Sequence, residues 1–365
     1  MLYQKEYIGY LKLQALSSSL PFIVSELALM NAWEAAKNAL ECVLEAKKGE
    51  NLAVFCDDVK MDVGTAFTNG ALKLGLQTRL VTLKTDANTF RKEIPSQLME
   101  ILTKQTPDIY INLLRGTREE TPFRIKLIQM ETKEHKARMG HCPGVTLDML
   151  THGALALTTH EHRQMQNFAK SLIQELGHTT KVKITNPAGT NVSLSVEGRE
   201  FFTDTIIDWK TMKWMNLPTG EVIVAPVENS LEGKLVCDMA IGGIGAIKAP
   251  LEIAIKNGRV EGVSSNERNV LERVKEGFDT DGWASVVGEF AFGINSKARF
   301  VQEFLEAEKM LGTIHIAFGN NSDIPGGKNQ SKNHLDLMVS KPTVKIFRSD
   351  GSSADVLVNG AFQHL

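Results

Sequence analysis

The chain has 365 residues, 42% of them hydrophobic and 23% charged, which is the composition of a globular protein with about two domains. Lys and Arg number 41 and Asp and Glu 43, so the formal net charge is −2 and the basic excess of a nucleic-acid-binding protein is missing. No apolar run reaches the roughly 18 residues of a membrane span. The four cysteines form no CxxC pair, and Pro21 and Glu26 interrupt the apolar segment near the N-terminus, so we expect a cytoplasmic protein without a signal peptide.

The first part of the chain alternates helix-like and strand-like segments. Helices are predicted at 25–47, 61–75, 91–104 and 120–136, where apolar residues recur at helical spacing. Short apolar strands are predicted at 51–58, 78–84 and 108–114. Because strands that alternate with helices form parallel βαβ units, residues 1–157 are predicted to form a doubly wound α/β domain around a parallel sheet.

The rhythm changes in residues 158–365, where short strands dominate. After a helix at 162–177, strands are predicted at 181–186, 191–196, 221–226, 234–240, 313–319, 335–340 and 343–348. The segment 251–264 has Asn-Gly between alternating apolar residues, which is a strong hairpin signal. Further helices are predicted at 266–277 and 299–310. This half is predicted to be an α+β domain with a bent, barrel-like sheet.

Four short segments of the second half place acids and histidines beside glycines. They are NLPTGEVIVAP with Glu221, VVGEFAFGIN with Glu289, GTIHIAFG with His315, and NHLDLM with His334 and Asp336. On a strand, His334 and Asp336 point to the same face because they are two residues apart. His315 has Ile314 and Ile316 as neighbours and therefore points away from both. Imidazole and carboxylate ligands suit Zn, Mn, Co or Fe(II).

Each of these residues also has an ordinary structural interpretation. A single strand histidine such as His315 is commonly a satisfied structural residue, and Glu221 after a turn fits a solvated strand edge. Glu289 is less ordinary, because a lone carboxylate among apolar residues is costly unless it is paired or bound to a metal. Spacing alone leaves the metal site and the structural interpretation open.

Other signals are interpreted as structural. The glycine-rich segment 241–250 is neither a dinucleotide-binding motif nor a P-loop, and its glycines are expected to permit close backbone packing. His160 and His162 fall at a predicted helix start and are interpreted as a solvated turn. No GxSxG motif is present, and no cysteine lies in an electropositive setting, so a serine or thiol nucleophile is not expected.

The four segments LPTGEVIVAP, GEFAFGIN, GTIHIAFG and GGKNQSKNHLDLM, in this order, resemble the metal-binding blocks of the M29 metallo-aminopeptidases. The resemblance covers roughly residues 180–345. It implies that two divalent ions (Zn, Co or Mn) are bound, that Glu289 is also the catalytic base, that N-terminal residues are removed from peptides, and that the protein is a homodimer. The metal ligands implied by the resemblance are Glu221, Glu289, His315, His334 and Asp336.

One feature departs from the peptidase pattern. That pattern has a tyrosine a few residues after the histidine of the third block, where it steadies the oxyanion, whereas this chain reads GNNSDIPGG. The only tyrosines of the chain are Tyr3, Tyr7, Tyr10 and Tyr110. Asn320, Asn321 or Ser322 could donate a hydrogen bond instead. The loss of one such donor costs on the order of 10²–10³ in rate.

Two alternatives remain open. The second half also resembles the 2,5-dihydroxypyridine dioxygenases, which hold one Fe(II) with two histidines and an aspartate, the residue types of His315, His334 and Asp336. Metal binding by Glu221 and Glu289 as well would favour a dinuclear hydrolase. A non-enzymatic relative that keeps the scaffold is the third class. The favoured expectation is an aminopeptidase-like hydrolase whose small substrate binds between the domains.

Overall fold

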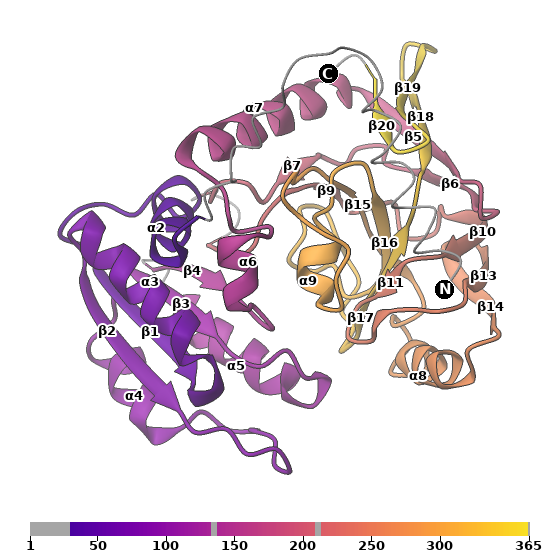
Figure 1. Cartoon of the computed structure of the whole chain (residues 1–365). Coiled ribbons are helices and arrows are strands. Elements are labelled where there is room, and N and C mark those ends of the chain that lie inside the picture. The colour runs from indigo at the N-terminus through magenta and orange to yellow at the C-terminus, as the bar shows by residue number, and fades with distance from the viewer. Residues whose placement is uncertain (1–29, 133–136, 209–212, 364–365) are drawn as a thin grey trace, which may run out of the picture.

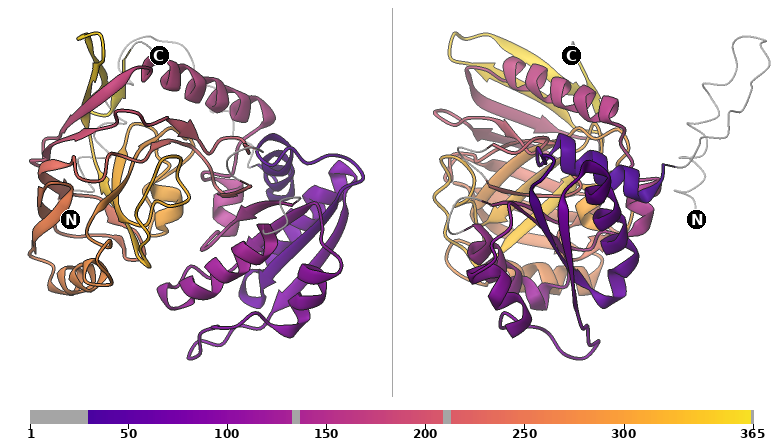
Figure 2. Two further views of the ribbon diagram at one scale, coloured as in Figure 1. Left: turned by 180° about the vertical axis from the view of Figure 1, so that it is seen from behind. Right: turned by 90° about the vertical axis from the view of Figure 1, so that its left-hand side faces the viewer.

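The structure, a computed structural model, describes residues 30–132, 137–208 and 213–363. Figure 1 shows two parts, one built around a parallel sheet and the other around antiparallel strands. The helix α7 (Thr159–Glu175) runs from the first part along the second, as both Figure 1 and the views of Figure 2 show. The predicted mixed α/β class is confirmed.

The first part contains four of the five strands of the parallel sheet and five α-helices among its described residues. Its elements in chain order are α2 (Ala32–Cys42), β1 (Asn51–Asp57), η1 (Asp58–Lys60), α3 (Met61–Leu74), β2 (Gln77–Leu83), α4 (Ser96–Thr103), β3 (Ile109–Leu113), η2 (Arg118–Glu120), α5 (Thr121–Thr132), β4 (Arg138–His141) and α6 (Leu147–Thr151). The sheet order is β2-β1-β3-β4-β8, and all four neighbouring pairs are parallel.

The two faces of this sheet are covered by different helices, as expected for a doubly wound fold. Leu52 and Val54 of β1 pack into an apolar cluster with residues of α2, α3 and α6. Ala53 and Phe55, which point the other way, pack into a second cluster with residues of α4 and α5. Successive side chains of β1 point to opposite faces of the sheet, so this one strand contributes to the apolar cores on both faces.

The predicted helices of this part differ from the observed ones at their ends. The helix predicted at 91–104 begins only at Ser96, because Pro95 disfavours helical backbone at the residue before it. The predicted stretches 25–29 and 133–136 lie outside the described residues.

One strand of the parallel sheet lies beyond the predicted boundary at residue 157. It is β8 (Trp214–Asn216), which pairs with β4 at the edge of the sheet. Gln166 of α7 also ties the two parts together, since its amide donates to the carbonyl oxygens of Cys42 at 2.9 Å and Thr205 at 3.0 Å. The division at residue 157 stays a prediction.

The second part contains two antiparallel sheets and the helices α8 (Arg268–Phe278) and α9 (Phe304–Ala307). Its strands are β5 (Thr179–Thr185), β6 (Asn191–Ser195), β7 (Phe202–Thr203), β9 (Glu221–Val224), β10 (Glu232–Cys237), β11 (Ala240–Ile241), β12 (Gly245–Ala246), β13 (Leu251–Lys256), β14 (Arg259–Ser265), β15 (Val287–Gly293), β16 (Ile314–Gly319), β17 (His334–Val339), β18 (Thr343–Arg348), β19 (Ser353–Val358) and β20 (Ala361–Phe362). The sheet orders are β14-β13-β10-β6-β5-β18-β19-β20 and β12-β11-β17-β16-β15-β9-β7.

These two sheets share one apolar core. Val182 and Leu235 of the eight-stranded sheet and Phe290, Ile316 and Leu337 of the seven-stranded sheet belong to the same buried cluster, which α7 also joins. The strands expected in one bent sheet are thus divided between two sheets that pack on each other. The other face of the seven-stranded sheet points away from this core and can carry polar side chains.

Local signals of the second part give mixed results. The predicted Asn-Gly hairpin is present between β13 and β14, and both Asn257 and Gly258 have the positive φ angles, 48° and 73°, that its tight turn requires. The helix predicted at 299–310 is reduced to Phe304–Ala307. His162 is buried rather than solvated, because it lies on the inner face of α7, and burial lowers its pKa to about 4.

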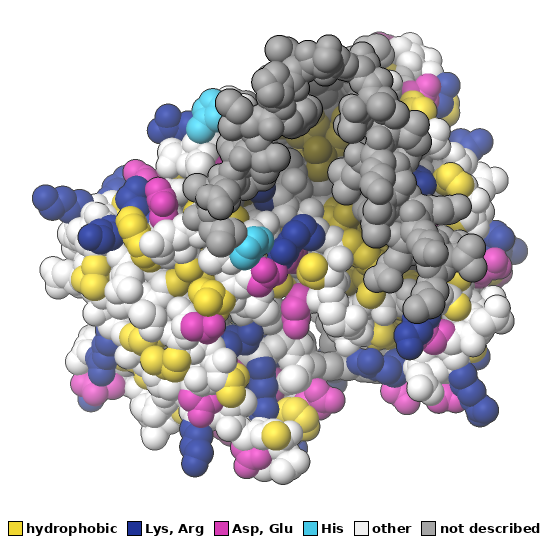
Figure 3. All heavy atoms as spheres, in the orientation of Figure 1, with side chains coloured by type: hydrophobic (Ala, Val, Ile, Leu, Met, Phe, Trp, Pro, Cys, Tyr) yellow, Lys and Arg dark blue, Asp and Glu magenta, His cyan; other side chains and the backbone are white. Residues whose placement is uncertain are grey.

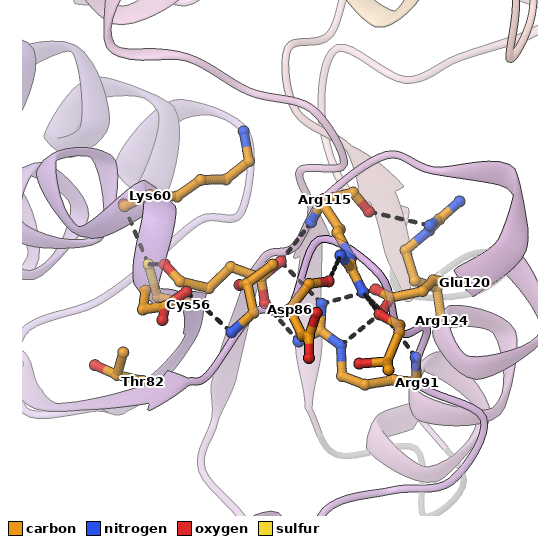
Figure 4. A network of polar contacts seen from close by, with 12 residues as sticks. Cys56, Lys60, Thr82, Asp86, Arg91, Arg115, Glu120 and Arg124 are labelled. Carbon is orange, nitrogen blue, oxygen red and sulfur yellow. Dashed lines mark hydrogen bonds and ion pairs between the residues drawn. The ribbon is translucent and has the colours of Figure 1, made fainter.

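A network of ion pairs and hydrogen bonds lies at the carboxyl end of the parallel sheet (Figure 4). The Glu120 carboxylate accepts hydrogen bonds from Arg91 Nη2 at 2.7 Å and Arg115 Nη2 at 2.6 Å. Asp57, at the end of β1, accepts from the Arg115 backbone N–H at 2.7 Å. Burial by itself would raise the pKa of Glu120, but the two guanidinium groups lower it to about 2.

We expect Glu120→Gln to lower the free energy of unfolding by about 3–5 kcal/mol at pH 7, because it removes the carboxylate that pairs with the partly buried Arg115 and leaves Arg91 with Asp57 alone. Since the pKa of Glu120 is lowered on folding from 4.5, its stabilising contribution is present above pH 4.5 and is lost as the pH falls towards 2. Urea unfolding at several pH values measures both effects. Glu93→Gln, at an exposed ion pair with Lys126, is the control, and an equal effect of both variants would contradict the role of the network.

The surface of the molecule carries both signs of charge. On the face shown in Figure 3, Lys and Arg side chains are interspersed with Asp and Glu side chains over the described part. Within the described ranges, no helix has the length and apolar content that crossing a bilayer demands.

Candidate metal centre

The five predicted ligands meet on one face of the seven-stranded sheet. They come from the neighbouring strands β17, β16, β15 and β9. Ile314 and Ile316 point into the shared core, so His315 points away from it, as its sequence position predicts. Leu335 and Leu337 likewise enter the core and leave His334 and Asp336 on the opposite face, together with Glu221 and Glu289.

The strand register keeps small residues between the polar ones. Ala317 of β16 lies opposite both Glu289 of β15 and Asp336 of β17, so only a methyl group separates the two carboxylate positions. His315 lies opposite Ala291, and His334 lies opposite Gly319. Large side chains at these positions would fill the space in which the ligands converge.

The ligand atoms lie within hydrogen-bond or ion-pair distance of one another. His315 Nε2 is 3.2 Å from Glu289 Oε1, 3.6 Å from Glu221 Oε1 and 3.9 Å from Asp336 Oδ1. His334 Nε2 is 3.1 Å from Asp336 Oδ1 and 3.4 Å from Glu289 Oε2. Glu289 therefore faces both imidazole rings, one with each carboxylate oxygen.

The electrostatics of this cluster are those of a site that attracts cations. Burial by itself would lower the pKa of His315, but Glu221 and Glu289 raise it to about 9. Burial would raise the pKa of Glu289, but its hydrogen bonds with His315 and His334 hold it well below its usual range. The neighbouring carboxylates thus favour positive charge at both histidines, in the place where a metal ion would supply it.

The donor set fits a divalent ion. Glu289, His315 and Asp336 each offer a ligand atom within 4.8 Å of the others. His334 Nδ1 donates to the backbone oxygen of Asn320 at 2.8 Å, which leaves Nε2 as the atom that turns towards the carboxylates. Glu221 Oε1 is buried and has no hydrogen-bond partner among the described residues. Two imidazole nitrogens and carboxylate oxygens suit Zn, Co or Mn.

Three charged residues that the sequence did not single out lie beside Glu221. Lys309 Nζ forms an ion pair with Glu221 Oε2 and lies 3.0 Å from Glu308 Oε1 and 3.6 Å from Asp204 Oδ2. Burial by itself would lower the pKa of Lys309, but Glu221, Glu308 and Asp204 raise it well above its usual value. Glu221, Glu308 and His315 form a second group whose ligand atoms lie within 4.8 Å.

Asp204 is held by the turn that precedes β9. Its Oδ1 accepts the backbone N–H groups of Gly220 at 2.9 Å and Glu221 at 2.7 Å. Gly220 has a φ of +139°, and a Cβ atom there would lie 2.5 Å from Asn295 Cβ, so only glycine fits. The PTG sequence before Glu221 is thus a structural part of the site.

The glycine-rich segment 241–250 packs against the strand that carries Asp336. The Gly242 N–H donates to the backbone oxygen of Asp336 at 2.9 Å. A Cβ atom at Gly242 would lie 2.9 Å from Asp336 Oδ2. The interpretation that these glycines permit close backbone packing is therefore confirmed at Gly242, and the backbone it packs against carries a predicted ligand.

The residues expected to replace the missing tyrosine are engaged elsewhere. Asn321 is buried and donates to the Gly288 oxygen at 3.1 Å while its own oxygen accepts from the Asn329 N–H at 2.7 Å. Ser322 donates to Asn320 at 3.0 Å, and Asn320 donates to Asp323 at 3.1 Å. Each of these three side chains thus already donates a hydrogen bond within the loop or to the neighbouring strand β15.

Two surface cavities lie away from the cluster. One surface cavity lies beside the end of α7, between Ile173 and Thr180, and another lies over β1 and β2 near Gln105. Neither is lined by the five predicted ligands. The expected substrate site between the domains stays a prediction.

The chain is similar to a known protein family and to two solved structures. The model of the thermophilic metalloprotease family (M29) matches residues 157–362, which include all five predicted ligands. The 2,5-dihydroxypyridine dioxygenase from Pseudomonas putida KT2440 is 16% identical, with a TM-score of 0.66 over 92% of this chain and 97% of its own. AmpT from Thermus thermophilus is also 16% identical, with a TM-score of 0.64 over 91% of this chain and 98% of its own.

At this identity the two solved structures show a shared fold and no more. Among curated proteins, none is similar enough in sequence to count as a relative. The family match implies a divalent metal and a peptidase-like chemistry, and the predicted resemblance to both groups of proteins is confirmed.

Proposed function

We propose, because the chain belongs to the thermophilic metalloprotease family M29, that it is a metal-dependent hydrolase that removes N-terminal residues from peptides. The observation that carries the proposal is the position of Glu289. Its two oxygens face His315 Nε2 at 3.2 Å and His334 Nε2 at 3.4 Å, on the same sheet face as Asp336. This position supports Glu289 as a base within the proposed set of metal ligands.

The ligands would be Glu289, His315, His334 and Asp336, with Glu221 at the margin of the set. A divalent ion held there lowers the pKa of water and polarises a carbonyl group. Glu289 would accept the proton of the attacking water and pass it to the leaving amine. The hydrogen bond from His334 Nδ1 to the backbone oxygen of Asn320 would keep the imidazole in position, with Nε2 turned towards the ion.

The identity of the ion is proposed from the donor types, which favour Zn, Co or Mn. The expectation of two ions per chain requires Glu221 to be a metal ligand. The Glu221 carboxylate already forms an ion pair with Lys309, which competes with that role. A cytoplasmic homodimer with a small peptide substrate, and without a nucleic-acid or membrane partner, remains part of the proposal.

The direct test is hydrolysis of a chromogenic amino-acid anilide by the chain loaded with Zn, Co or Mn. We expect cleavage of the anilide with a free α-amine and none of its N-acetylated counterpart. Because the loop after His315 has no tyrosine at the place where the peptidase pattern has one, we expect turnover on the order of 10²–10³ lower than that of a peptidase with such a donor. Equal cleavage of both anilides, or of neither with any of the three ions, would refute the aminopeptidase proposal.

A second candidate is ring cleavage by a single Fe(II). The observation that favours it is the presence of His315, His334 and Asp336 in one cluster on the fold that the chain shares with the dioxygenase. Such an enzyme would ignore the anilide and consume O₂ with a dihydroxylated aromatic ring. Oxygen uptake after anaerobic loading with Fe(II) separates the two functions.

A further inference from the structure

Lys309 is a buried lysine without access to solvent. Only 1% of its surface is exposed, although it lies just two residues after Ala307, the last residue of the short helix α9. Its ammonium group faces three carboxylates, those of Glu221, Glu308 and Asp204. The ammonium donates a hydrogen bond to Glu221 and lies within ion-pair distance of Glu308 and Asp204.

The backbone holds this lysine in place. The Lys309 carbonyl oxygen accepts the Asn295 N–H at 2.8 Å, and the Lys309 N–H donates to Glu306 at 3.2 Å. Asn295 is itself fully buried, and its amide donates to Ala154 at 2.9 Å and Thr219 at 2.8 Å. Lys309 is thus anchored at both its backbone and its charged end, unlike a mobile surface lysine.

The described structure contains two groups of candidate metal ligands, and Lys309 contacts the carboxylates of one of them. One group is Glu289, His315 and Asp336, and the other is Glu221, Glu308 and His315. In the second group both carboxylates already contact the Lys309 ammonium. His315 belongs to both groups, and its Nε2 lies closer to Glu289, at 3.2 Å, than to Glu221, at 3.6 Å.

We propose that the Lys309 ammonium is a built-in cation of this centre and takes the place of a second divalent ion beside Glu221. The chain then binds one divalent ion, held by Glu289, His315, His334 and Asp336. A second ion within coordination distance of Glu221 and Glu308 would be repelled by the adjacent ammonium in a buried setting where charges are weakly screened. The inference rests on the proposed metal centre and deepens it by assigning the number of ions.

The experiment is a titration of the metal-free full-length chain with Co²⁺, followed by calorimetry and by elemental analysis after dialysis. We expect one Co²⁺ per chain in the wild type and two in Lys309→Met, because the substitution frees Glu221 and Glu308 while keeping a similar volume. Lys234→Met is the matched control, since Lys234 pairs with Glu252 at 3.5 Å on the surface of the same domain. It should bind one ion.

Two Co²⁺ per wild-type chain would overturn the inference, and so would one Co²⁺ in both the wild type and a folded Lys309→Met. Glu221→Gln gives a test that does not depend on the folding of the lysine variant. We expect this variant to bind one Co²⁺ as well, with an affinity that is reduced by less than about tenfold. The loss of an outer partner of a metal site reduces the affinity by about 10–100-fold, so this expected loss is smaller. Loss of the ion in Glu221→Gln would make Glu221 a ligand and contradict the proposal.

The failure of this inference differs from the failure of the proposed function. A chain that binds one ion but cleaves no anilide supports the inference and refutes the function. A chain that binds two ions and cleaves the anilide overturns the inference and keeps the function. A chain that binds no ion overturns both.

Discussion

Glu289→Gln should lower kcat by about 10²–10⁴, the contribution of a general base, while KM stays close to that of the wild type. Glutamine keeps the size of the side chain and one oxygen that can face His315 or His334, but it cannot accept the proton of the attacking water. Initial rates on a chromogenic amino-acid anilide at several concentrations separate the two constants.

The matched control for this variant is Glu252→Gln, an exposed carboxylate on β13 of the same domain. It should leave both constants unchanged. The metal content of Glu289→Gln must be measured alongside, because Glu289 also faces both histidines. A variant that retains its ion and changes only KM would show that Glu289 is not the base.

Asp336→Ala and His334→Ala should each abolish metal binding and activity while leaving the fold intact. Loss of even an outer partner costs a metal site about 10–100-fold in affinity, so loss of a ligand should cost more. The fold should survive because both side chains lie on the face of β17 that points away from the shared core, where Leu335 and Leu337 pack.

Elemental analysis, activity and thermal unfolding of both variants check this expectation. Asp355→Ala, at an exposed carboxylate of β19, is the control and should behave as the wild type. Full activity in either His334→Ala or Asp336→Ala would remove that residue from the site. A collapse of the fold in both would mean that they serve the structure instead.

The strand pattern made much of this site predictable. Side chains alternate between the two faces of a strand, so His315 points to the face opposite to that of Ile314 and Ile316. For the same reason His334 and Asp336 point to one common face. Those directions depend only on the residues next to each position, so they follow from the sequence once the strands are assigned. The M29 resemblance supplied the order of the four segments, and the family match covers the same region.

The charged partners of Glu221 were not predictable in the same way. A continuous helix over 299–310 would turn Glu308 and Lys309 in directions about 100° apart, so both would not face the site. The observed helix ends at Ala307, and the backbone of Lys309 then pairs with Asn295. This contact is set by the approach of two distant segments, which local periodicity does not contain.

Asp204 illustrates a second limit. Nothing in the sequence around it marks a functional acid, because its role depends on the backbone N–H groups of Gly220 and Glu221, which lie 16 and 17 residues later. Asn321 shows the opposite error. Its place in the loop suggested a donor for an oxyanion, whereas the fold uses both ends of its amide to hold the loop against Gly288 and Asn329.

Removal and return of the metal ion tests the central claim most directly. Initial rates on the amino-acid anilide would be measured for the chain as purified, after exhaustive treatment with a chelator, and after addition of Zn, Co or Mn. We predict that activity is lost with the ion and returns when an ion is added, and that Asp336→Ala shows no activity at any stage. Undiminished hydrolysis by the metal-free chain would contradict the account.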